Sequence, residues 1–264
     1  MRNAPTPVPA YTIDGDGPWL TLLHGFSQDS TIWDAAAEQL EEQFRVLRID
    51  LRGHGRSSSF PGPFGPREYL ADVLAALNHA EVPATHLWGT HTGAGIALLL
   101  AAEHPDRVGG LILEGAVIPG VPVPPVDEWH ARMRTLLAEQ GAEAAVATWW
   151  EQAPFFTHAR QLAAERNRSE MREAILRFTA APWSDTTLPA PLPPAPGMLA
   201  AVRAPTLLLN GADDMPEFLV IAKQLERSLT TVRRVVVPNV GAFPGWEAPE
   251  VVTPVVATFL DEVD

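Results

Sequence analysis

The residue of this chain best placed to do chemistry is His91, which has a glycine two residues before it and another two residues after it. Residues 85–88 read as a short strand that leads into the first glycine, and residues 91–104 as an apolar helix that Pro105 ends. A tight turn between strand and helix needs small residues on both sides of its centre, because the two elements nearly collide there. Such a turn holds its central side chain over the sheet in an unusual backbone conformation. An imidazole in that place can accept and donate protons near neutral pH.

Two carboxylates elsewhere in the chain are candidates to orient this imidazole. Asp214 follows a strand predicted at residues 206–210, and Glu114 lies near the end of an apolar strand within residues 107–116. A carboxylate beside His91 would raise the pKa of the imidazole and fix its tautomer. We predict that His91 is an acid/base residue with one of these two acids as its partner, and the sequence does not choose between them. The alternative is that His91 fills its place without a catalytic role.

The elements around this turn alternate between strands and helices. Strands are expected within residues 19–23, 44–50, 85–88, 107–116, 206–210 and 232–237. Helices are expected within residues 32–42, 67–79, 91–104, 217–229 and 251–260. This alternation predicts an α/β fold with a mostly parallel central sheet and helices on both faces.

Residues 118–196 depart from that alternation. Prolines cluster at both ends of this segment, and helical patterns lie between them. Its large aromatic residues are Trp129, Trp149, Trp150, Phe155, Phe156 and Trp183. Proline-rich hinges around an aromatic helical insert predict a lid, and we expect most of these aromatics to pack the lid against the rest of the protein. The predicted organisation is a core domain of residues 1–117 and 197–264 with a helical lid insertion of residues 118–196.

Composition narrows the classes of partner. A chain of 264 residues with 46% hydrophobic residues can form one α/β domain with an insertion. The formal charge of −13 argues against a nucleic-acid partner, which needs a basic face. The absence of cysteine excludes disulfides, thiol nucleophiles and thiolate metal sites. No apolar run has the length to span a membrane and no secretory signal is visible, so we expect a cytoplasmic protein; its oligomeric state is left open.

Several motifs, taken together and in order, resemble those of the α/β-hydrolase superfamily over essentially the whole chain. They are His24-Gly25-Phe26, residues 50–57, the turn at residues 89–93, Gly211-x-x-Asp214, and residues 241–247. The chain looks most similar to the branch of small lactonases, ester hydrolases and C–C hydrolases that includes the 3-oxoadipate enol-lactonases. The resemblance implies an α/β-hydrolase fold with a nucleophile elbow at residues 89–93.

The family's catalytic triad is altered at two of its three positions. The resemblance implies a nucleophilic serine, an acid and a histidine base in that chain order. Here His91 stands at the nucleophile position and Ala242 at the base position, and only the acid, Asp214, matches. An ordinary serine-hydrolase mechanism cannot run on this set. The family's oxyanion hole uses two backbone N–H groups, which map onto Phe26 and Thr92 and survive replacement of the triad side chains.

The histidines outside the elbow form no recognisable catalytic or metal-binding motif. His24 and His54 belong to loop motifs of the family, and we expect them to hold those loops. The sequence assigns no role to His130 and His158, which lie in the predicted lid. No spaced ligand motif such as His-Glu-x-x-His is present, and the elbow lacks the glycine pattern of nucleotide binding. We therefore predict neither a metal nor a cofactor.

Three functions fit this pattern. We predict a non-hydrolytic enzyme in which His91 acts as general acid/base in lyase, isomerase, cyclase or addition chemistry, with the oxyanion hole stabilising an enolate or alkoxide. The aromatic lid favours a small apolar substrate. The second candidate is a hydrolase of an ester or lactone, with His91 activating water or acting as nucleophile. The third is a ligand-binding protein that kept the fold without catalysis, because a fold alone does not imply a function.

Overall fold

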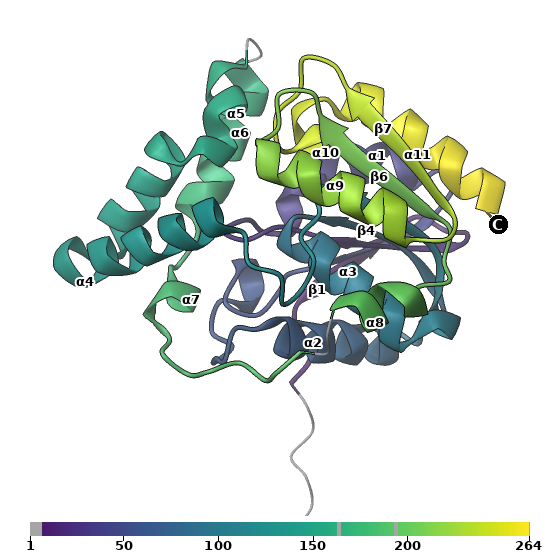
Figure 1. The fold of residues 1–264 in the computed structure, drawn as a ribbon, viewed down its shortest axis with the longest axis horizontal. Coiled ribbons are helices and arrows are strands. Elements are labelled where there is room, and N and C mark those ends of the chain that lie inside the picture. Colours follow the sequence, from purple (N-terminus) through teal and green to yellow (C-terminus); the bar gives the residue numbers. More distant parts are fainter. Residues whose placement is uncertain (1–6, 163–164, 193–194, 264) are drawn as a thin grey trace, which may run out of the picture.

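A mostly parallel sheet forms the centre of the molecule (Figure 1). The structure, a computed structural model, describes residues 7–162, 165–192 and 195–263. Its strands are β1 (Tyr11–Asp14), β2 (Trp19–Leu23), β3 (Arg45–Ile49), β4 (Thr85–Thr90), β5 (Val108–Glu114), β6 (Thr206–Gly211) and β7 (Val232–Val237). Within the described residues they form one sheet in the order β1-β3-β2-β4-β5-β6-β7, in which β1 alone runs antiparallel to its neighbour. The predicted mostly parallel sheet is confirmed, and β1 is an addition to it.

Helices cover both faces of the sheet. The structure has α1 (Asp34–Leu40), α2 (Pro66–His79), α3 (Thr92–Glu103), α8 (Ala195–Ala201), α9 (Pro216–Ser228), α10 (Pro244–Glu247) and α11 (Pro249–Val263). On one face α2, α3, α8 and α9 pack against one another in a row, and on the other α1 packs against α11 (Figure 1). Short 3-10 helices are η1 (Ser30–Trp33), η2 (Gly55–Ser57), η3 (Pro105–Arg107) and η4 (Pro154–Phe156). Because both faces are covered, every residue of β4 and β6 is buried.

The segment predicted as a lid is helical. It contains α4 (Pro124–Gln152), α5 (Thr157–Gln161), α6 (Glu165–Leu176) and α7 (Ala181–Ser184). Helix α4 changes direction at Gly141, whose backbone has non-helical angles (φ 87°, ψ 174°). Figure 1 shows α4, α5 and α6 as a group beside the sheet, connected to it through the loops that follow β5 and precede β6.

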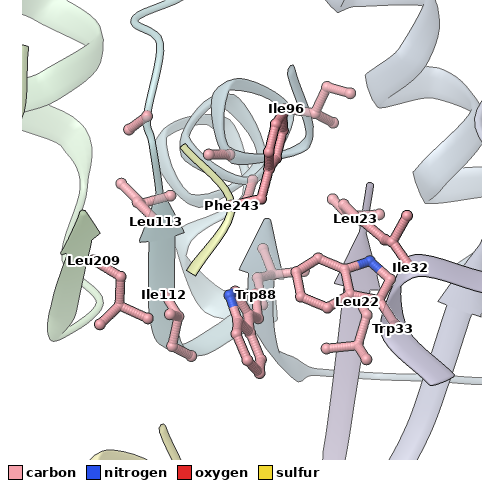
Figure 2. Close-up of a cluster of buried hydrophobic side chains, with 14 of the residues drawn as sticks. Leu22, Leu23, Ile32, Trp33, Trp88, Ile96, Ile112, Leu113, Leu209 and Phe243 are labelled. Atoms are coloured by element: carbon pink, nitrogen blue, oxygen red, sulfur yellow. The ribbon is translucent and has the colours of Figure 1, made fainter. Parts of the chain in front are cut away.

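Helix α3 is buried along most of its length, and its packing holds the turn that precedes it. Residues 93–102 of α3 are all buried, as expected for a helix that is apolar on every side. Figure 2 shows Ile96 of α3 above the ends of β2, β4 and β5, among the side chains of the buried cluster. Below it Trp88 packs against Trp33 with 4.8 Å between ring centroids. Full burial of an aliphatic side chain such as that of Ile96 contributes roughly 1.5–3 kcal/mol to folding.

The register of the sheet brings the functional loops together. Leu23 of β2 pairs with Gly89 of β4, Gly89 pairs with Leu113 of β5, and Glu114 pairs with Leu209 of β6. The carboxyl ends of four parallel strands therefore lie side by side, and ligands of open α/β sheets bind at that edge. Among the described residues, no helix has the length and hydrophobicity required to cross a membrane.

Candidate active site

His91 sits at the centre of a strained turn between β4 and α3. Its backbone angles are φ 46° and ψ −107°, a region that residues other than glycine rarely adopt. Its N–H donates to the Glu114 carbonyl at 2.8 Å, and its own carbonyl accepts the Gly95 N–H at 2.9 Å. Strain of this kind persists only where the surrounding structure enforces it, and it concentrates at functional sites. The predicted nucleophile-elbow geometry is thus present, with an imidazole at its apex.

The flanking glycines are required by close approach of backbone to backbone. A Cβ atom on Gly89 would lie 2.4 Å from the carbonyl carbon and oxygen of Gly93. A Cβ atom on Gly93 would lie 2.1 Å from the carbonyl oxygen of Leu23, at the end of β2. Helix α3 therefore begins in contact with β2 and β4, and this contact fixes the position of the turn that carries His91.

The imidazole of His91 makes its hydrogen bond with a main-chain carbonyl. Its Nε2 lies 2.9 Å from the Ala242 oxygen, and because a carbonyl can only accept, Nε2 carries the proton. The ring packs edge-on against Phe218 and tilted against Phe243, with centroids 4.6 and 4.8 Å away. Burial in these apolar surroundings lowers the pKa of His91 to about 4. The imidazole is therefore neutral at pH 7, with Nδ1 as its basic nitrogen.

This arrangement corrects the expectation that a carboxylate raises the pKa of His91. Asp214, in the loop after β6, accepts hydrogen bonds from the Asn210 side chain (3.0 Å) and the Met215 N–H (2.8 Å). Glu114 accepts the Trp88 indole N–H (3.2 Å) and the N–H of residue 245 (3.0 Å). Neither acid is hydrogen-bonded to the His91 ring in the part of the chain that the structure describes. The structure brings Asp214 and Glu114 to the same edge of the sheet as His91 without pairing either with it.

Burial makes both acids weak. It raises the pKa of Glu114 to about 8 and that of Asp214 to about 7, because desolvation penalises the ionised form more than the local N–H donors favour it. Glu114 therefore retains its proton in the folded protein at pH 7, whereas an exposed glutamate loses it near pH 4.3. It is a buried neutral acid at the end of β5.

We expect Glu114 to make the folded state less stable as pH rises from about 4.5 to about 8. Its folded pKa is raised, so over this interval the unfolded chain has released the proton while the folded protein still holds it, and ionisation favours unfolding. In Glu114→Gln, the amide oxygen still accepts the N–H groups of Trp88 and Gly245, and this pH dependence disappears. The difference in unfolding free energy between variant and wild type should move in favour of the variant by about 4 kcal/mol between pH 5 and pH 9.

Urea unfolding at pH 5 and pH 9 measures that difference directly. Glu103→Gln, a change to a partly exposed glutamate at the end of α3, serves as the control. If Glu114→Gln and wild type show the same pH dependence, the carboxyl group is not buried in its neutral form.

A small apolar chamber lies against the His91 ring. Its volume is about 60 Å³. Its walls include Phe26, Thr92, Val117, Trp149, Phe155 and Phe218. We call it the inner chamber. The predicted oxyanion-hole residues, Phe26 and Thr92, both reach it, and Thr92 is the first residue of α3, where backbone N–H groups have no partner within the helix.

Two loop histidines have the structural roles that the sequence indicates. His24 accepts the Leu51 N–H on Nε2 (3.0 Å) and donates from Nδ1 to the Gly25 carbonyl (2.8 Å). His54 accepts the Ser27 N–H (3.3 Å) and donates to the Arg52 carbonyl (2.8 Å). Burial lowers the pKa of both rings, that of His54 to about 3, so each is a neutral bridge between loops.

Three further polar residues lie in or next to the inner-chamber wall, and the sequence assigned them no role. His130 of α4 lines the inner chamber and accepts the Trp183 indole N–H at 2.9 Å, and burial lowers its pKa to about 4. His158 of α5 contacts the buried Glu247 of α10, with 2.5 Å between Nδ1 and Oε2. The spacing between His158 and Glu247 in the chain gives no signal for this contact. The described residues contain no group of three or more His, Asp or Glu side chains arranged to hold a metal ion.

The chain is similar to known proteins in both sequence and fold. Residues 18–249 match the family model described as the alpha/beta hydrolase fold. A 2-succinyl-6-hydroxy-2,4-cyclohexadiene-1-carboxylate synthase from Enterobacter sp. (strain 638) is 31% identical over 258 residues, covering 92% of each chain. A thermophilic esterase from Thermogutta terrifontis superposes with a TM-score of 0.82 at 27% identity, covering 96% of this chain and 93% of the esterase. The enol-lactonase from Burkholderia xenovorans LB400, at 21% identity, shares the fold with a TM-score of 0.77 and 96% coverage of both chains.

Proposed function

We propose that this chain, which belongs to the alpha/beta hydrolase fold family, catalyses non-hydrolytic acid/base chemistry on a small, largely apolar molecule. The observation that carries the proposal is the His91 imidazole, held neutral at the strained elbow with its Nε2–H bonded to the Ala242 carbonyl. This bond fixes the tautomer and leaves Nδ1 as proton acceptor. Serine and the usual base are both missing, so proton transfer is the chemistry that the elbow retains.

The proposed step is removal of a proton from the ligand by Nδ1 of His91. The electron pair left on the ligand delocalises onto an oxygen, and the backbone N–H groups of Phe26 and Thr92 stabilise that oxyanion. The pKa of about 4 keeps His91 unprotonated before the reaction. As the proton moves, the developing oxyanion stabilises the imidazolium, so the base becomes stronger in the transition state. The same ring then returns the proton to another atom of the ligand or to a leaving group.

The surroundings of His91 support an apolar ligand and a closed site. Aromatic rings from α4, η4 and α9 line the inner chamber together with Phe26 and Phe243, and such pockets favour apolar groups. We extend the proposal to residues 118–196 as a lid that excludes water from the reaction, with residues 1–117 and 197–264 as the core. A relative named as a synthase supports a reaction other than hydrolysis, although an esterase is also similar.

Hydrogen–deuterium exchange measures the proposed proton transfer without knowledge of the product. A panel of small cyclic ketones, aryl ketones and lactones is incubated in D2O, and loss of the α-proton signal is followed by proton NMR. We expect exchange of at least one member to be accelerated by the wild type and to fall at least about 100-fold in His91→Asn. Asparagine suits this position because it tolerates positive φ better than most residues.

The control is His79→Asn, which removes an exposed histidine of α2. Ester and lactone cleavage is recorded in the same samples. Cleavage that depends on His91, without exchange, would replace this proposal with a hydrolase. Binding without exchange or cleavage would leave a ligand-binding protein.

A further inference from the structure

A second cavity lies directly behind the His91 site. It has a volume of about 210 Å³ and is lined by Phe155, His158, Gln161, Asp213, Met215 and Ala242, among others. We call it the outer cavity. It lies between the α5 region and the loops that follow β6 and β7, the loops that carry the acid and base positions of the family. Two features show how it is related to the inner chamber.

The first feature is a shared wall. Phe155 lines both cavities, and residues 242 and 243 line one each. Phe155 belongs to the short helix η4 and packs against Trp149 and Phe218, with centroids 5.0 and 6.4 Å away. The inner chamber alone, at about 60 Å³, is well below the roughly 150 Å³ of a protein cavity that holds one benzene molecule. An organic ligand in contact with His91 must therefore extend beyond the inner chamber, and the outer cavity lies on the other side of Phe155, which lines both.

The second feature is the residue at position 242. The Ala242 carbonyl accepts the His91 hydrogen bond, while the same residue lines the outer cavity. A methyl group stands where the family resemblance implies an imidazole. The space that a larger side chain would take is thus left to the outer cavity, next to the His91 site.

The polar groups of the outer cavity are arranged to receive a neutral hydrogen-bonding group. Nδ1 of His158 is bonded to Glu247, whose carboxylate also accepts the N–H groups of Gly241 (2.8 Å) and Phe243 (3.1 Å). This network fixes the His158 ring on the cavity wall and leaves its Nε2 for a ligand. Gln161 adds an amide, which can donate and accept. Asp213 on the cavity wall supplies negative charge, and Glu247 lies behind His158, so an anionic ligand group is disfavoured.

We propose that the two cavities form one binding site for an elongated amphipathic molecule. Its apolar end occupies the inner chamber at His91. Its neutral polar end, an alcohol or amide, forms a hydrogen bond with His158 in the outer cavity. Phe155 rotates away to join the two parts. This names the substrate class for the proposed acid/base activity and depends on that activity for the reaction, but not for the binding.

Calorimetric titration with 4-phenyl-1-butanol tests the proposal. 4-Phenylbutyrate has the same apolar part with an anionic end, and ethylbenzene has no polar end. We expect the alcohol to bind wild type several-fold more tightly than the carboxylate. His158→Ala should weaken binding of the alcohol about tenfold, which is the effect of one lost hydrogen bond. The affinity for ethylbenzene should stay the same. Val117→Phe, which fills the inner chamber, should weaken the binding of both the alcohol and ethylbenzene.

Circular dichroism establishes that each variant is folded, and His79→Ala is the control for loss of a histidine elsewhere. If His158→Ala weakens the binding of the alcohol and of ethylbenzene equally, His158 only holds α5 in place, and the proposal is overturned. No effect of Val117→Phe on the alcohol, or no binding of the alcohol up to its solubility, also overturns it. If exchange at His91 is never found but the binding pattern holds, the shared site stands and the proposed reaction fails.

Discussion

Gly93→Ala is expected to destabilise the protein by at least about 3 kcal/mol, one of the two largest effects we predict. The new Cβ atom would lie 2.1 Å from the carbonyl oxygen of Leu23, 2.6 Å from the carbonyl carbon of the same residue and 2.7 Å from the carbonyl oxygen of His24. All three are backbone atoms at the end of a central strand, so no side-chain rotation relieves the clash. Overpacking in a core costs about 1–3 kcal/mol where neighbours can adjust, and more where they cannot.

Helix propensity favours alanine over glycine, so propensity alone predicts that Gly93→Ala stabilises the protein. The predicted loss of stability can therefore come only from the clash. Alanine in a helix is about 1 kcal/mol more favourable than glycine. Gly197→Ala in α8 is the matched control, because its Cβ atom would meet nothing within 4 Å. We expect that variant to be more stable than wild type by up to about 1 kcal/mol. Urea unfolding of both variants measures the contrast, and a loss below 1 kcal/mol in Gly93→Ala would mean that β2 and α3 are not held in close contact.

The same contact explains why the fold could be predicted from the sequence. Glycines two residues on either side of His91 indicate a turn in which strand and helix touch, and the long buried runs indicate central strands. Strand β1 was not predicted, because its four residues are half-buried and mix polar with apolar types. Its alternation of apolar and polar residues covers only four positions and includes no buried residue, so its pairing with β3 is what defines it.

The site could be predicted only in part, for a different physical reason. The position of His91 follows from local spacing, but its hydrogen-bond partner is a main-chain carbonyl, which every residue has and no residue type signals. The direction of its pKa depends on burial by Phe218 and Phe243, which come from distant parts of the chain. The contact between His158 and Glu247 spans 89 positions and depends on how α5 meets α10. Side-chain identity alone contains none of this information.

The residues around the elbow support the second large prediction. Asp214 is held by Asn210 and the Met215 N–H, independently of any histidine partner. The elbow is strained as a nucleophile position requires, and Thr92 begins α3 beside it. We propose that Asp214 and the backbone N–H groups of Phe26 and Thr92 can serve acyl transfer once a serine and a histidine stand at positions 91 and 242.

The paired substitution of His91→Ser with Ala242→His is expected to give ester hydrolysis at least about 100-fold faster than either single substitution. The serine hydroxyl would attack the ester carbonyl, and the imidazole at position 242 would accept its proton. Asp214 would orient that imidazole and gain a cationic partner, which offsets the burial that now raises its pKa to about 7. Neither single substitution suffices, because triad members act as a unit.

Initial rates on 4-nitrophenyl acetate measure this gain, and an initial burst of 4-nitrophenol would identify the acyl-enzyme. Adding Asp214→Asn to the paired variant should remove most of the activity, since the imidazole then lacks its carboxylate. Circular dichroism confirms that the compared proteins are folded. If the paired variant is no faster than His91→Ser alone, Asp214 and the backbone N–H groups are not positioned for acyl transfer. The oxyanion hole that we assign to the His91 reaction would then lose its main support, because both reactions place their negative oxygen at the same two donors.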